Sequence, residues 1–409
     1  MQTTLAGWWR EPTKAQWLSF AAAWFGWVLD AFDFTVFLLV MPDIAREMGV
    51  ENLATTGSIA LTLFARLLGG FLAGAAADRW GRKLPLMISI VWFALCDGAV
   101  SIAPSFTWIV ILRTLFGFGM GAEWASGTTL AMVNWPARSR GIASGILQGS
   151  WAIGYFLAAA ASAWVVPVFG WRAMFVIAAV PALLVLPIRI WVPESAGWKE
   201  ACAGLERALH KSRPRDLTGR IVWGSLLMAA GFGAYYGLTG LYPTLLRSDL
   251  GLDGDAVARL VMLFNGGMLV GSALSGILAA RRGVTLAIAV PALASLPFLP
   301  LYVGAHPALL GVGAVFGGLF GAGFCGTVPL LLTDLFPPEA RARSIGIVYH
   351  VGSAAAALVP TLEAALARYA GMPLGRSVLV VTAFFETLVA VLMIARALRP
   401  VAFHAEVRS

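Results

Sequence analysis

Long apolar runs, separated by short turns rich in arginine, are the feature that most restricts what this chain can fold into. Each run holds about twenty residues, which is the length that an α-helix needs to cross a bilayer. The twelve runs lie near residues 17–41, 55–77, 84–103, 106–132, 141–166, 171–191, 220–247, 256–280, 284–303, 306–334, 342–370 and 375–397. We therefore predict an all-α, polytopic membrane protein with twelve transmembrane helices.

Composition agrees with this class and excludes several others. The 409 residues are 59% hydrophobic and 12% charged, and the mean hydropathy is +0.81, far more apolar than a soluble domain. The net charge of +8 comes from turns rather than from one basic face, so nucleic acid is not an expected partner. The three cysteines have no paired spacing, and no catalytic triad or nucleotide-binding loop is recognisable. We expect no metal, no cofactor and no enzymatic activity.

The positions of the basic residues predict the orientation. Arginine and lysine gather in the even-numbered turns between runs, which places those turns and both termini in the cytoplasm of a cell that carries the protein in its inner membrane. A charged segment divides the runs into six plus six. The predicted bounds are a cytoplasmic N-terminus at 1–16, a first six-helix bundle at 17–192, a cytoplasmic linker at 193–219, a second bundle at 220–397 and a cytoplasmic tail at 398–409.

Carboxylates inside the apolar runs are candidates for proton binding. Asp30 and Asp33 lie three residues apart in the first run, so they share a helix face and repel each other if both are ionised. Glu123 lies ten residues beyond Arg113 in the fourth run. We predict proton coupling at these three acids, with salt bridges to arginines on neighbouring helices as the alternative for the aspartates. Glu363 and Glu386 are expected near helix ends, and His350 at the membrane interface.

Other polar and aromatic residues within the runs are candidates for substrate binding. Arg66 can bind a carboxylate through two parallel hydrogen bonds, although pairing with Asp30, Asp33 or Asp97 is an equal alternative. Arg113 serves either transport or the neutralisation of the aspartates. The full predicted set is Arg66, Arg113, Gln148, Trp124, Tyr155, Tyr235, Asn265 and Tyr349. For the aromatic members, packing within the bundle is the alternative.

A basic turn between the second and third runs carries a recognisable pattern. Residues Gly74 to Lys83 read G-x-x-x-D-R-x-G-R-K, and this resembles the loop between the second and third helices of the major facilitator superfamily. The resemblance implies two pseudo-symmetric six-helix halves that alternate access to a central site. It also implies a conformational gate at Gly74, Asp78, Arg79, Gly81 and Arg82.

Two further stretches are similar to one branch of that superfamily. Residues 29–34 resemble the first helix of sialate and aromatic-acid proton symporters. Residues 121–124, with 140–148 and 154–155, resemble the fourth and fifth helices of the sialate:proton symporters, which include the lactate permeases. The branch implies a monomer that carries a small organic anion together with protons. Tyr236 and Gly240 replace a histidine and an aspartate of the lactate-permease pattern.

The cargo is expected to be a monocarboxylate such as lactate or pyruvate. Sialate or an aromatic acid is the alternative, as is proton-independent export or exchange of another solute. A membrane receptor that transports nothing is a third possibility, disfavoured because the sequence has no soluble signalling domain.

Overall fold

The protein is a bundle of long helices in two halves. The computed structural model describes residues 7–80, 83–133, 135–136, 138–180, 217–336 and 341–398, and every regular element in these ranges is helical. Seven of the described helices are long and apolar enough to cross a membrane, and shorter apolar helices occupy Met87–Val100, Phe106–Gly121 and Trp171–Val180. The predicted all-α polytopic architecture is confirmed.

The first half begins with the longest helices. It comprises α1 (Lys14–Met48), α2 (Asn52–Trp80), α3 (Lys83–Val100), α4 (Phe106–Val133), α5 (Arg140–Phe169) and the helix at Trp171–Val180. The start of α1 is fixed by a capping box, in which the Thr13 hydroxyl accepts from the Gln16 backbone N–H and the Thr13 N–H donates to Gln16 Oε1. Its end is fixed by Gly49, which has φ of 65°.

The second half is built from more broken helices. It comprises α8 (Leu217–Thr239), α9 (Tyr242–Thr244), α10 (Gly254–Arg282), α11 (Val284–Ser295), α12 (Leu299–Tyr302), α13 (Leu310–Phe316), α14 (Val328–Leu335), α15 (Arg341–Ala356), α16 (Val359–Tyr369) and α17 (Leu374–Leu398). Short irregular helical turns link several of these, such as Gly317–Ala322 and Gly323–Thr327 in the glycine-rich tenth run. The described part of this half runs from Leu217 to Leu398, and linker residues 193–216 lie outside the described ranges.

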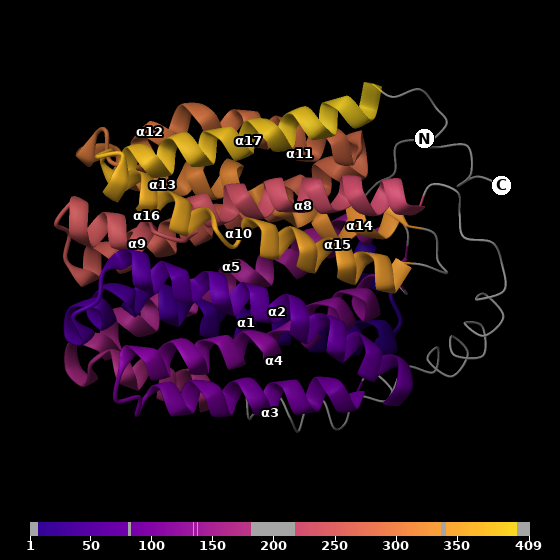
Figure 1. Cartoon of the computed structure of the whole chain (residues 1–409). Helices are drawn as coiled ribbons and strands as arrows, with labels where there is room; N and C mark the ends of the chain where they lie inside the picture. Colours follow the sequence, from indigo (N-terminus) through magenta and orange to yellow (C-terminus); the bar gives the residue numbers. More distant parts are fainter. Residues whose placement is uncertain are drawn as a thin grey trace.

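The halves lie side by side, and two helix pairs make the most extensive contacts between them. In Figure 1 the indigo and purple helices α1–α4 form the lower layer, and the orange and yellow helices form the upper one. The first contact runs between α5 and α10 and the second between α2 and α15. Glycines allow the backbones to meet: a Cβ on Gly145 would lie 2.6 Å from the Ser272 carbonyl oxygen. Ser144 Oγ donates to the Gly326 carbonyl at 2.7 Å.

The two ends of the bundle differ in charge. The end at which α5 begins and α10 finishes carries Arg140, Arg281 and Arg282, and we call it the basic end. Gly141 of α5 and Gly276 of α10 are in contact there. We call the other end of the bundle the opposite end, and there arginines are paired with carboxylates. These pairs are Arg172 with Glu47, Arg247 with Asp43 and Arg368 with Glu51.

The pair between Arg172 and Glu47 also affects the pKa of Glu47. Glu47 follows the apolar run of α1, so it lies outside the predicted membrane span. It accepts from Arg172 at 2.5 Å and from the Trp171 indole N–H at 2.7 Å. These hydrogen bonds hold the pKa of Glu47 below its ordinary value.

Candidate functional site

A central cavity lies between the two halves at mid-depth in the bundle. It measures about 700 Å³, counting the part that is open to solvent. Both halves contribute its walls, through α1, α2 and α5 on one side and α8, α10, α15 and the tenth run on the other. Its polar and aromatic lining consists of Trp27, Arg66, Gln148, Trp151, Phe232, Tyr235, Tyr236, Phe324, Cys325 and Tyr349. A cavity shared between two rigid halves is where alternating access places a substrate.

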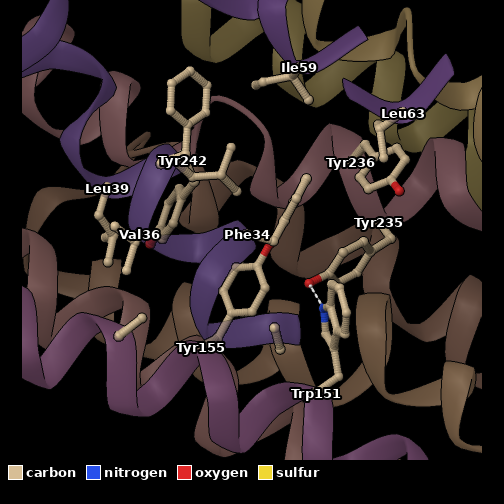
Figure 2. Close-up of a cluster of buried hydrophobic side chains, with 14 of the residues drawn as sticks. Phe34, Val36, Leu39, Ile59, Leu63, Trp151, Tyr155, Tyr235, Tyr236 and Tyr242 are labelled. Atoms are coloured by element: carbon tan, nitrogen blue, oxygen red, sulfur yellow. Dashed lines mark hydrogen bonds between the residues drawn. The ribbon is translucent and has the colours of Figure 1, made fainter. Parts of the chain in front are cut away.

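Aromatic rings form much of the wall and connect the halves. The Trp151 indole N–H donates to Tyr235 OH at 2.5 Å, which joins α5 to α8, as Figure 2 shows. The Trp27 and Trp151 ring centroids are 5.1 Å apart, and those of Phe34 and Tyr236 are 6.3 Å apart. These flat, buried faces suit a ligand that is itself flat and partly apolar.

Arg66 supplies the charge of the cavity. It is the one charged side chain among the described lining residues, and it is 1% exposed. Its Nε and Nη2 atoms make no hydrogen bond with any residue that the structure describes. The guanidinium carbon lies 5.5 Å from the Tyr349 ring centroid, and Asp30 attracts the guanidinium from α1. Two buried donors that face a cavity can bind a carboxylate.

Arg113 occupies a different place. Its Nη1 pairs with Asp97 Oδ1 of α3 at 2.9 Å, and both side chains are buried. Its guanidinium carbon lies 4.0 Å from the Phe116 ring centroid, and Asp33 attracts it as well. Arg113 therefore packs inside the first half and is not part of the central cavity's described lining.

The remaining predicted residues divide between two cavities. Gln148, Tyr235 and Tyr349 line the central cavity with Arg66. Tyr155 and Asn265 line a smaller cavity, where Asn265 Nδ2 donates to the Val261 carbonyl at 2.8 Å.

Two predicted residues of α4 and the predicted conformational gate have side chains that lie outside the described part of the structure. Glu123 and Trp124 lie in α4, and Gly74, Asp78 and Arg79 lie in the last turns of α2, but their side chains are outside the described set. Gly81 and Arg82 lie outside the described residues altogether.

Two ionisable residues, His350 and Glu386, differ from their predicted places. His350 is 3% exposed and lies against Gly70 of α2, so it is buried between the halves rather than at the membrane interface. Glu363 and Glu386 are both fully buried. Glu363 lies in the second turn of the short helix α16, whereas Glu386 lies at the middle of α17 and not near a helix end. The position of Glu386 in the middle of the last apolar run was a signal for its depth, because both ends of that run are about three turns away.

Trp27 and Cys325 line the cavity without having been predicted to do so. Neither carries a charge or a motif that would distinguish it from the other apolar residues of its run.

Comparison with known proteins identifies the family. The family model of the Major Facilitator Superfamily matches residues 23–310 and 225–408. The chain belongs to the Major Facilitator Superfamily. It is a membrane transporter and not an enzyme.

Individual relatives agree with the predicted branch. The sialic acid transporter NanX of Escherichia coli (strain K12) is 30% identical over 94% of this chain and 95% of its own length. The cis,cis-muconate transport protein of Acinetobacter baylyi is 27% identical over 88% of this chain and 89% of its own. The predicted resemblance to the sialate branch is thereby confirmed.

A solved structure shows the same fold. The proton:xylose symporter XylE superimposes with a TM-score of 0.74 at 20% identity, over 93% of this chain and 95% of that chain.

Proposed function

We propose that this transporter imports an organic carboxylate together with protons by alternating access. The observation that carries the proposal is Arg66, a buried guanidinium on the wall of the central cavity with two nitrogens free of hydrogen bonds to described residues. A buried cation of this kind is costly unless an anion completes its hydrogen bonding. A carboxylate would do so through two parallel bonds.

The walls favour one class among the expected carboxylates. Lactate and pyruvate, predicted from the sequence, are small and would cover little of the Trp27, Trp151 and Tyr236 faces. A conjugated or aromatic acid would lay a flat face against these rings while its carboxylate reached Arg66. The relative that transports cis,cis-muconate, a conjugated acid, supports this choice.

Proton binding is proposed at the acids that the sequence singled out. Asp30 and Asp33 are each 1% exposed on α1, and Asp30 acts electrostatically on Arg66. Protonation of Asp30 would free Arg66 for the substrate anion, which couples the two ligands. Glu123 is retained as a candidate from its sequence position alone.

Topology is part of the same proposal. The arginines of the basic end would lie in the cytoplasm with both termini, and the opposite end would face outward from the inner membrane. The ion pairing of arginines at the opposite end supports this orientation. We propose a monomer, since each chain brings both halves of its own cavity.

Uptake into proteoliposomes tests the function. The acids would be lactate, pyruvate, benzoate, cis,cis-muconate and sialate, each with and without an inward proton gradient. We expect gradient-driven accumulation of a conjugated or aromatic acid, lost in Arg66→Gln and retained in Arg172→Gln, a matched change at the surface of the first half. Uptake of the acid that ignores the gradient would refute proton coupling and favour exchange. Full activity of Arg66→Gln would refute the anion site.

A further inference from the structure

Two carboxyl groups are buried within the second half, away from the acids discussed so far. Glu363 of α16 and Glu386 of α17 are each 0% exposed. None of their four carboxyl oxygens has a hydrogen-bond partner among the described residues. Thr382, one helical turn before Glu386 on α17, is also fully buried, and its hydroxyl is unpartnered in the same described set.

Two of these side chains meet on α8, and the third lies beside the tenth run. A Cβ built on Gly237 would lie 3.3 Å from Glu363 Oε1 and 2.7 Å from Thr382 Oγ1, so both side chains meet at the bare backbone of that glycine. A Cβ built on Gly321, in the tenth run, would lie 3.0 Å from Glu386 Oε1. Residues four apart on a helix share a face, which puts Thr382 between the two carboxyls.

No cation among the described residues offsets either acid. Among the described titratable groups, Glu363 acts electrostatically on Tyr302, and Glu386 on Cys325. The other titratable groups on the elements packed around them point elsewhere. Tyr235 and Tyr236 of α8 and Arg66 of α2 line the central cavity, Arg368 of α16 pairs with Glu51, Arg376 is exposed at the start of α17, and Arg396 lies over Trp223 near its end.

Each end of this series approaches a hollow. Ala367, one turn beyond Glu363, and Leu241, one turn beyond Gly237, line a hollow at the opposite end of the bundle. Val389, three residues after Glu386, and Cys325, four residues after Gly321, line the central cavity. The polar series therefore lies between the two spaces.

An ionised carboxylate without a cation or hydrogen bonds is strongly disfavoured inside a membrane protein. The neutral acid is tolerated much better, and it can give up its proton only where water or another acceptor reaches it.

We propose that Glu363, Thr382 and Glu386 form a proton route through the second half, from the hollow at the opposite end to the wall of the central cavity. Glu363 takes a proton from water in the hollow. As it does so, Glu363 gives its own proton to the Thr382 hydroxyl, Thr382 gives its proton to Glu386, and the acid proton of Glu386 leaves to water in the central cavity. One proton crosses, and each group ends with the number of protons it had. The side chains turn toward one another for the transfer, because no hydrogen bond joins them in the resting structure. The role of this route in coupling protons to the substrate rests on the proposed function. The existence of the route itself does not depend on that function.

Infrared spectroscopy of the purified protein in liposomes tests the route without a transport substrate. We expect the carboxylic acid C=O band at neutral pH to lose one component in Glu363→Gln and another in Glu386→Gln, with no loss in Asp255→Asn, a change at an exposed acid of α10. After transfer to heavy water, the Glu386 component should shift at least about tenfold more slowly in Glu363→Gln and in Thr382→Val. The Glu363 component should keep its rate in Glu386→Gln. A band that neither glutamine variant reduces, or unchanged exchange of Glu386 in Thr382→Val, would overturn the route.

Transport separates the route from the proposed function. If wild type accumulates the acid under a proton gradient, we expect Glu386→Gln to lose accumulation while still exchanging the acid across the bilayer. Retained accumulation in both glutamine variants would overturn the coupling role. If wild type shows no gradient-driven uptake, symport is refuted, and the infrared result alone decides the route.

Discussion

The ion pair between Asp43 and Arg247 closes the opposite end of the bundle by joining the two halves. Asp43 lies in the last turns of α1, and Arg247 follows α9 in the second half. Their closest atoms, Arg247 Nη1 and Asp43 Oδ2, are 2.6 Å apart, and the side chains are only 17% and 19% exposed. If the halves separate at this end during transport, this contact must break.

The contact is strong enough to shift the balance between closed and open states. A hydrogen bond between charged groups contributes about 1.5–3 kcal/mol. Partial exposure and the second partner of Asp43, Arg46, reduce the loss in Arg247→Gln to about 1–2 kcal/mol. A loss of that size changes the population ratio by about 5- to 30-fold. Arg247→Gln should therefore raise the open fraction by that factor as long as the closed state dominates.

Cys325 reports the change, because it lies half-buried on the central cavity wall. In a Cys202→Ser background, a membrane-impermeant maleimide added to intact cells should label Cys325 about 5- to 30-fold faster in Arg247→Gln than in the parent. Arg172→Gln is the matched control, since it removes an ion pair that lies wholly within the first half. Labelling in that variant should stay at the parental rate.

Two results would refute the reasoning. Equal labelling of Arg247→Gln and its parent would show that the ion pair does not hold the end closed. Equal acceleration by Arg172→Gln would show a general loosening of that surface. The charge-swapped pair Asp43→Arg with Arg247→Asp should restore slow labelling, and its failure to do so would indicate that another property of Arg247 matters.

Three further changes address stability, measured by thermal unfolding in detergent. Gly154→Ala places a methyl group against the α1 backbone and should cost about 1–3 kcal/mol, whereas Gly266→Ala meets nothing within 4 Å and should be neutral or stabilising; equal effects would contradict the close packing. Arg113→Gln strands the buried carboxylate of Asp97 and should cost about 3–5 kcal/mol, most of it recovered when Asp97→Asn is added; no recovery would mean that the arginine acts through packing. Because its pKa is lowered in the fold, Glu47 stabilises the protein above its unfolded pKa and loses this effect as the pH falls through its folded pKa. Wild type should therefore lose stability relative to Glu47→Gln below about pH 4, by less than about 1 kcal/mol, and parallel pH profiles would contradict this linkage.

The sequence placed charged residues inside the membrane but did not give their partners or, for His350 and Glu386, their depth. Arg66 and Arg113 were both recognised as buried cations, but the sequence could not decide between a role in transport and pairing with buried aspartates. In the structure Arg113 reaches Asp97 of α3, whereas Arg66 faces the central cavity. Helical spacing fixes which residues share a face of one helix, but the rotation of that face toward a neighbour depends on packing among several helices.

The last two helices show the same limit. The sequence did not predict that Glu363 and Glu386 lie near each other, because they are 23 residues apart in different runs. In the structure Gly237 of α8 leaves room for Glu363 and Thr382 to meet, while Glu386 lies beside Gly321 of the tenth run.

The sequence by itself determined the class, the helices and the family. Apolar runs of bilayer length leave the backbone no alternative to helices, and the motif at Gly74 to Lys83 identified the superfamily. Only the tertiary structure decided which side chains share a cavity and which ion pairs close its ends. The physical reason is that both depend on contacts between helices far apart in the chain, such as Trp151 with Tyr235 and Asp43 with Arg247, and those contacts are set by the packing of whole helices rather than by local spacing.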